Sequence, residues 1–176
     1  MSSREGPRAV GSDGSDFTHR EQVASQYVIS VQLKSKLKTY LLLNAFLASV
    51  QGILLIWSHL KIIQVEPLPW QYMWFASLIP SLIGLTSLPR NRQIYLRLSN
   101  AGTVALGMGG MLFGILHHFD ALKEFLTKGK ADVLVGDTVP LVVCLYLVFT
   151  VMVGLYLLTL YYANNLINAW SSKKAR

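Results

Sequence analysis

The sequence predicts an all-α membrane protein in which four transmembrane helices form a bundle with cytosolic N- and C-termini. Four stretches contain no Asp, Glu, Lys or Arg, and they cover 39–58, 70–88, 98–116 and 139–161. Each is close to the roughly 20 residues that a helix needs to cross the ~30 Å hydrocarbon core of a bilayer. Hydrophobic residues make up 52% of the chain and charged residues 14%, a balance typical of proteins that face lipid. Helices are expected because lipid offers no hydrogen-bond partners and the stretches lack the alternation of barrel strands.

The segment before the first span divides into two parts. Residues 1–16 are rich in Gly, Ser, Pro and charge, so we predict a disordered cytosolic tail. In 17–38, Val23, Tyr27 and Val31 recur every four residues, which predicts a cytosolic pre-membrane helix. This helix has two interpretations: a membrane-surface or partner-binding helix, or simply the solvated lead-in to the first span.

The second and third spans carry the helix-breaking and small residues. Pro80 lies near the middle of the second span, where it removes a helical hydrogen bond and predicts a kink between 77 and 81. The third span has the most glycines, and we expect it to be the least hydrophobic and the most buried. Its Gly110 and Gly114 have the GxxxG spacing that permits close helix approach. Packing within the bundle is the favoured use of this pair, because so short a match is weak evidence for an oligomer.

The fourth span is the most hydrophobic, and we expect its helix to start at Pro140. Residues 39–161 then form one membrane domain, followed by a cytosolic tail at 162–176. Within that tail, Lys173 and Lys174 are fourth and third from the end. This is the dilysine pattern that the coat of Golgi-to-reticulum vesicles recognises, and it requires a cytosolic chain end. The alternative is a stop-transfer cluster, for which any basic residues suffice.

The distribution of basic residues predicts the orientation. Twelve of the 16 Lys and Arg residues lie in the two tails and the second loop, and four lie in the first and third loops. The third loop also contains four acidic residues. Because positive charge accumulates on the cytosolic side, both termini are expected in the cytosol and the third loop in the lumen.

The spans contain little that suggests catalysis. Their notable polar residues are Asn44, Gln51 and Asn100, which we expect to form hydrogen bonds across helices. Ionisable residues at depth usually mark enzymes and transporters, and these stretches have no charged ones. Cys144 is the only cysteine, which excludes an intrachain disulfide and a cysteine-based zinc site. We therefore predict no enzymatic activity, no cofactor and no nucleic-acid partner.

Three other classes of membrane protein are an enzyme, a channel or transporter, and a purely structural protein. His117, Asp120 and Glu124 lie near one helical face, but further ligands are needed for a metal site, so we predict none there. A lipid-modifying enzyme using this edge lacks a nucleophile. A small channel or transporter is disfavoured by the absence of intramembrane charge. A purely structural protein that shapes the reticulum is not separable from a trafficking protein by sequence.

Two separated motifs resemble the Jagunal family. The segment from Gly11 to Phe17, followed by His19-Arg20-Glu21, is similar to the N-terminal signature of that family. The segment from Pro80 to Leu85, then Leu88-Pro89-Arg90-Asn91, is similar to its second span and following cytosolic loop. The dilysine ending and the chain length agree as well, while the third and fourth spans match mainly in hydropathy.

The resemblance implies a non-enzymatic endoplasmic reticulum protein needed for reticulum organisation and vesicle traffic in the early secretory pathway. The implied partners are the lipid bilayer, the vesicle coat complex at Lys173 and Lys174, and secretory cargo or cargo receptors. If the matched cytosolic segments form a single surface, they are candidate adaptor sites. That candidate adaptor surface consists of Asp13, Asp16, Phe17, His19, Arg20, Glu21, Arg90, Asn91 and Arg92.

Overall fold

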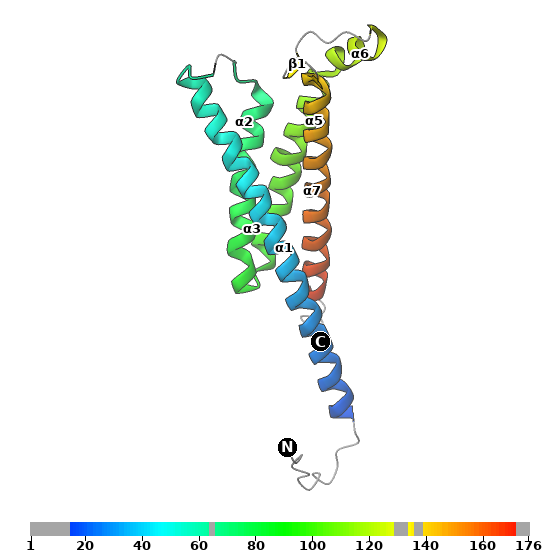
Figure 1. Cartoon of the computed structure of the whole chain (residues 1–176). Helices are drawn as coiled ribbons and strands as arrows, with labels where there is room; N and C mark the ends of the chain where they lie inside the picture. The colour runs from blue at the N-terminus through cyan, green and yellow to red at the C-terminus, as the bar shows by residue number, and fades with distance from the viewer. Residues whose placement is uncertain (1–14, 64–65, 129–133, 136–138, 172–176) are drawn as a thin grey trace, which may run out of the picture.

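Four packed helical segments form the protein. The computed structural model describes residues 15–63, 66–128, 134–135 and 139–171. Within these residues, four segments are long and apolar enough to cross a membrane: Tyr27–His59, Pro69–Arg90, Gln93–His117 and Leu141–Ser171. They pack side by side and alternate in direction (Figure 1). This confirms the predicted all-α fold class with four membrane-crossing helices.

The first helix, α1 (Ser15–His59), is a single helix of 45 residues. It includes both the predicted pre-membrane segment at 17–38 and the first span, without a break between them. Its N-terminal part extends past the other helices (Figure 1). The residues before 15 lie outside the described part of the chain.

The second span consists of two helices, α2 (Pro69–Ala76) and α3 (Leu78–Arg90), separated at Ser77. Pro80 has no N–H to donate to the carbonyl four residues earlier, so the helix cannot continue regularly through this point. Ser77 instead donates its hydroxyl to the carbonyl oxygen of Trp74 at 2.6 Å. Ser81 donates its own hydroxyl to the carbonyl oxygen of Ser77 at 3.0 Å. The predicted interruption near Pro80 is thus confirmed.

The third span contains α4 (Gln93–Gly102), the π-helical segment η1 (Thr103–Met108) and α5 (Gly109–His117). The π-helical segment was not predicted. The expectation that this span is the most buried is wrong, because the first three spans each bury 33% of their most apolar window. It is also not the least hydrophobic, since its mean hydropathy of 1.3 exceeds the 1.2 of the second span. Its glycines let side chains of neighbouring helices pack closely against them, while other faces of the helix remain exposed.

The connection to the last helix has structure of its own. It contains α6 (Phe119–Lys128) and two short antiparallel strands, β1 (Leu134–Val135) and β2 (Val139–Pro140). The last helix, α7 (Leu141–Ser171), begins one residue after Pro140. The prediction that Pro140 marks the start of this helix is therefore correct to within one residue, and Pro140 itself pairs with Leu134 in the strand ladder.

The bundle has two ends and two core clusters. The tail end is where the N-terminal half of α1, the α3–α4 turn and the end of α7 meet, and the loop end carries α6 and the strands (Figure 1). The tail-end core consists of Leu37, Leu41, Leu88, Leu96, Ala163, Leu166, Ile167 and Trp170. The loop-end core consists of Trp70, Trp74, Met111, Phe149, Met152 and Tyr156.

The outer surface of the helices is strongly apolar. Phe46, Ile56, Leu112 and Leu147 are each more than half exposed. A contiguous apolar exterior of this kind is stable when hydrocarbon, rather than water, surrounds it. The exterior therefore agrees with four helices that cross a bilayer.

Polar side chains join the helices inside the bundle. Asn44 Nδ2 on α1 donates to Thr159 Oγ1 on α7 at 2.8 Å, and both side chains are buried. Asn100 Nδ2 on α4 donates to Asn164 Oδ1 on α7 at 3.1 Å. The expectation that these two asparagines bond across helices is confirmed. Gln51 is also buried.

Candidate functional site

The turn between α3 and α4 holds three of the predicted candidate residues. Helix α3 ends at Arg90, and Asn91 adopts the left-handed conformation with φ of 51°. Asparagine tolerates this conformation better than most residues other than glycine, which suits it to a helix C-terminus. Arg92 is extended and precedes the first residue of α4. The turn thereby directs consecutive polar residues out of the tail end.

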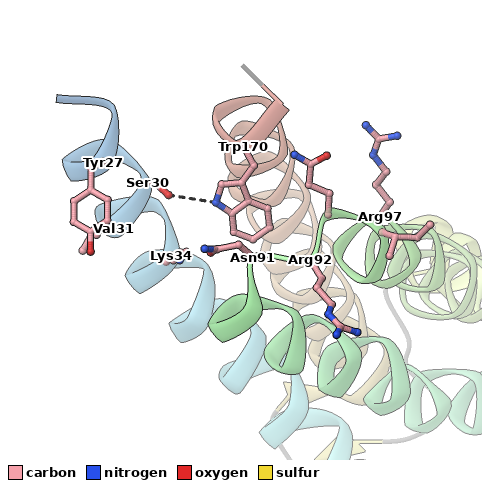
Figure 2. A pocket seen from close by; sticks show the side chains of 10 residues that line it. Tyr27, Ser30, Val31, Lys34, Asn91, Arg92, Arg97 and Trp170 are labelled. Atoms are coloured by element: carbon pink, nitrogen blue, oxygen red, sulfur yellow. Dashed lines mark hydrogen bonds between the residues drawn. The ribbon is translucent and has the colours of Figure 1, made fainter. Parts of the chain in front are cut away.

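A pocket of about 570 Å³ opens beside this turn. Three separate parts of the chain line it, namely α1, the α3–α4 turn with the start of α4, and the last turn of α7 (Figure 2). We call it the tail-end pocket, and its lining residues are Tyr27, Ser30, Val31, Lys34, Asn91, Arg92, Gln93, Ile94, Arg97 and Trp170.

The wall between α1 and α7 is ordered by a buried tryptophan. Trp170 Nε1 donates to Ser30 Oγ at 3.3 Å, and both residues are 7% exposed (Figure 2). Lys34 Nζ lies 5.7 Å from the centre of the Trp170 ring, within the range of a cation–π interaction. One aromatic side chain thus contacts both a hydroxyl and an ammonium group of α1.

The tail-end pocket is basic. Lys34, Arg92 and Arg97 line it, and the lining residues that the structure describes include no carboxylate. The Arg92 guanidinium lies 5.5 Å from the Tyr95 ring centre, and its Nη1 donates to Tyr95 Oη at 3.4 Å. Among the residues that the structure describes, none of these three cations forms an ion pair. The pocket is therefore suited to an anion.

The predicted candidate residues are only partly gathered at this site. Asn91 and Arg92 line the pocket, and Arg90 ends the adjacent helix. The candidates in the N-terminal signature occupy the first turns of α1, before the pocket-lining Tyr27. Their side chains are outside the described part of the chain. These are Asp16, Phe17, His19, Arg20 and Glu21. Asp13, Lys173 and Lys174 lie outside the described residues.

Of the ten residues that line the pocket, only Asn91 and Arg92 were predicted site residues, and those missed include Ser30, Lys34, Arg97 and Trp170. Two of them gave a signal, since Lys34 is one of the basic residues before the first span and Trp170 is an aromatic residue beyond the fourth. Both features have an ordinary explanation in membrane orientation and interfacial anchoring. Only the packing of α1 against α7 shows that they meet.

The two predicted helix-packing glycines lie at the loop end. A Cβ atom added to Gly110 would stand 3.1 Å from Met73 Cβ. A Cβ atom added to Gly114 would stand 2.9 Å from Phe149 Cζ. Both glycines therefore face neighbouring helices of the same chain.

The structure describes the histidine cluster at the loop end, His117 and His118. Within the described residues, no group of three or more His, Cys, Asp or Glu side chains could hold a metal ion. The rings of His117 and His118 instead pack edge to face with centroids 5.1 Å apart. Burial, and then the charge of His117, lower the pKa of His118. Trp70 and Phe149 also contact this ring, so the environment favours neutral imidazole.

The whole chain is similar to known proteins. The family model described as "Jagunal, ER re-organisation during oogenesis" matches residues 1–174. "Protein jagunal homolog 1" of Homo sapiens is 35% identical over 175 residues, covering 97% of this chain and 94% of the relative. "Protein jagunal" of Drosophila melanogaster is 31% identical over 192 residues, covering 99% and 98%. "Protein jagunal homolog" of Caenorhabditis elegans is 29% identical over 189 residues, covering 99% of each. With one family matched along nearly its full length, the chain belongs to the Jagunal family.

Proposed function

We propose that this chain is a non-enzymatic membrane protein of the endoplasmic reticulum, with both termini in the cytosol. In this role it supports reticulum organisation and vesicle-mediated transport in the early secretory pathway. Membership of a family described by reticulum re-organisation supports the organelle and the broad role. In the described part of the chain, the buried polar side chains are all Ser, Thr, Asn or Gln, which supports a scaffold rather than a catalytic or conducting interior.

The observation that carries the proposed orientation is the unequal charge of the two ends. The described basic side chains at the tail end are Lys34, Lys36, Lys38, Arg90, Arg92 and Arg97. Those at the loop end are Lys61 and Lys123, and three carboxylates, Glu66, Asp120 and Glu124, accompany them there. Positive charge favours the cytosolic side of a membrane. The asymmetry therefore supports a cytosolic tail end.

The proposed mechanism is recruitment of a vesicle coat, cargo or a cargo receptor by cytosolic segments. Lys173 and Lys174 follow α7 in the sequence and supply two ammonium groups. Two adjacent ammonium groups suit an acidic pocket on a soluble receptor. The α3–α4 turn, which holds Arg90, Asn91 and Arg92, is the second proposed contact.

The retrieval role is tested by comparing two double variants of the full chain in cells. Lys173→Arg with Lys174→Arg keeps both charges, whereas Lys173→Ser with Lys174→Ser removes them. A coat that recognises lysine ammonium groups should release both variants to the Golgi or the cell surface, because guanidinium has a different shape. The measurement is localisation by immunofluorescence together with capture of coat subunits.

Arg176→Ser is the matched control, since it removes a nearby charge but leaves both lysines. It should remain in the reticulum and capture coat subunits like the wild type. If the arginine pair is also retained, charge alone suffices and the lysines act as a stop-transfer cluster. If both double variants stay in the reticulum and still support its organisation, a structural scaffold explains the protein better than a coat adaptor.

A further inference from the structure

We propose that the tail-end pocket binds the phosphate-bearing headgroup of an anionic membrane lipid. This inference goes beyond the proposed trafficking role and does not depend on it. It requires only that the four helices cross a bilayer, which places the pocket near the membrane surface. The shared chemistry is a phosphate monoester, and the source that the pocket favours is a lipid.

Three cations from separate elements supply the charge. Lys34 comes from α1, Arg92 from the α3–α4 turn and Arg97 from α4. A phosphate monoester carries a charge of about −1.5 to −2 and three acceptor oxygens, so it is attracted to a pocket lined by cations. No described carboxylate pairs with these side chains, so their positive charge is not already neutralised by a neighbouring residue.

The start of α4 adds further donors on the same side. Arg92 occupies the N-cap position, where no side chain caps the helix, and the first turn holds no acidic residue. The first N–H groups of a helix have no partner within it, and the N-terminal end of the helix dipole is positive. Gln93 and Ile94, which begin α4, both line the pocket. An anion there would meet backbone donors as well as the cations.

The pocket is partly organised in advance. Trp170 is held by its hydrogen bond to Ser30, and Lys34 Nζ lies 5.7 Å from the Trp170 ring (Figure 2). Holding an ammonium group in place reduces the conformational entropy lost when an anion binds. Arg92 is held similarly against Tyr95.

The rim of the pocket distinguishes a lipid from a free phosphate compound. Val31 is 46% exposed and Ile94 is 74% exposed, and both line the pocket. Leu98, one turn after Ile94 on α4, is 56% exposed. These apolar side chains suit acyl chains, because burying their surface against hydrocarbon is favourable. The volume of about 570 Å³ also falls in the range of ligand pockets.

The test uses the full-length chain purified in a non-ionic detergent and measures binding by microscale thermophoresis. The probes are dioctanoyl phosphatidylinositol monophosphate, dioctanoyl phosphatidylcholine and the matching inositol bisphosphate, which lacks acyl chains. The wild type should bind the phosphorylated lipid saturably and at least about tenfold more tightly than either other probe, because only that lipid offers both charge and acyl chains. Raising the salt concentration should weaken the binding.

The decisive variant is Lys34→Gln with Arg92→Gln and Arg97→Gln. Since each basic residue near an anionic surface contributes about fivefold, the triple change should weaken binding by about a hundredfold. The control triple, Lys61→Gln with Lys123→Gln and Lys128→Gln, removes the same charge at the loop end and should bind within about twofold of the wild type. Arg97→Gln alone removes an exposed side chain and should cost about fivefold without disturbing the fold.

Three results would overturn the assignment. Equal weakening by both triple variants would mean attraction by net charge alone. Equal affinity for phosphatidylcholine would mean that the headgroup is not recognised. If inositol bisphosphate bound as tightly as the lipid, the pocket would serve a soluble phosphate compound instead. None of these results bears on coat capture by Lys173 and Lys174.

Discussion

At the scale of single residues, two glycines on the third span make room for two large aromatic side chains. A Cβ atom at Gly107 would stand 2.8 Å from Tyr156 Cζ, and one at Gly114 would stand 2.9 Å from Phe149 Cζ. Both aromatic residues are almost fully buried in the loop-end core. Because these side chains have no free space into which to move, the absence of a Cβ atom is what lets α7 approach this closely.

We predict that Gly107→Ala and Gly114→Ala each destabilise the protein. Overpacking of a filled core costs about 1–3 kcal/mol, and equilibrium unfolding in mixed detergent micelles measures it. Gly154→Ala on α7 is the matched control, since no atom lies within 4 Å of its added Cβ. That control should be neutral or stabilising by about 0.5–1 kcal/mol, as for other Gly→Ala changes within helices. Equal effects at all three positions would contradict the role of close approach.

At the scale of elements, the contact between α1 and α7 joins the first helix to the last. Asn44 and Thr159 form a buried hydrogen bond in its middle. Nearer the tail end, the rings of Tyr40 and Tyr162 stack with centroids 5.3 Å apart and an angle of 14° between planes. Polar bonds and ring contacts matter here because lipid removes most of the hydrophobic preference of one helix for another.

We predict that Asn44→Ala and Thr159→Val are energetically coupled. A double-mutant cycle on unfolding in detergent should give a coupling free energy of about 0.6 kcal/mol, the usual size for polar pairs in membrane bundles. Asn44→Ala combined with Thr127→Ala should be additive, because the Thr127 hydroxyl bonds carbonyls of its own exposed helix. Additive behaviour of the Asn44 and Thr159 pair would show that the bond has no net role.

Some elements were predictable from sequence and others were not, for physical reasons. The four spans were evident because a helix is the only way for an uncharged apolar stretch to satisfy its backbone in lipid. The break near Pro80 followed from the missing N–H group. The tail-end pocket was not predictable, because Lys34, Arg97 and Trp170 meet only through the relative rotation of three helices, which hydropathy does not specify. The π-helical turn at Thr103–Met108 was likewise not predicted from the sequence.

At the scale of the whole molecule, the charge asymmetry and the alternating direction of the helices both bear on which side of the membrane each end of the bundle faces. Four crossings return the chain to its starting side, so the tail end holds both ends of the bundle (Figure 1). A reversed insertion would expose the tail-end cations to the lumen and the loop-end carboxylates to the cytosol. Because positive charge is favoured on the cytosolic side of a membrane, we expect the opposite insertion, with the tail end in the cytosol.

We predict that a glycosylation acceptor introduced at 129–133, after α6, is modified in microsomes. An acceptor introduced before Ser15 should remain unmodified, because that segment leads into α1 from the side of the bundle that we propose is cytosolic. The measurement is a glycosidase-sensitive shift on a gel. Modification of only the N-terminal acceptor would reverse the topology and, with it, the proposed access of Lys173 and Lys174 to a cytosolic coat.

The length of α1 determines how far its first turns lie from the rest of the bundle. At about 1.5 Å per residue, its 45 residues span about 67 Å, more than twice the ~30 Å thickness of the hydrocarbon core. The part from Ser15 to Gln26 alone projects about 18 Å beyond the pocket-lining Tyr27. A continuous helix is stiffer than an extended linker, so it would keep its first turns at a set distance from the pocket. A partner gripping its first turns would be held at a set clearance from the lipid surface, and removing one helical turn would lower that partner by about 5 Å.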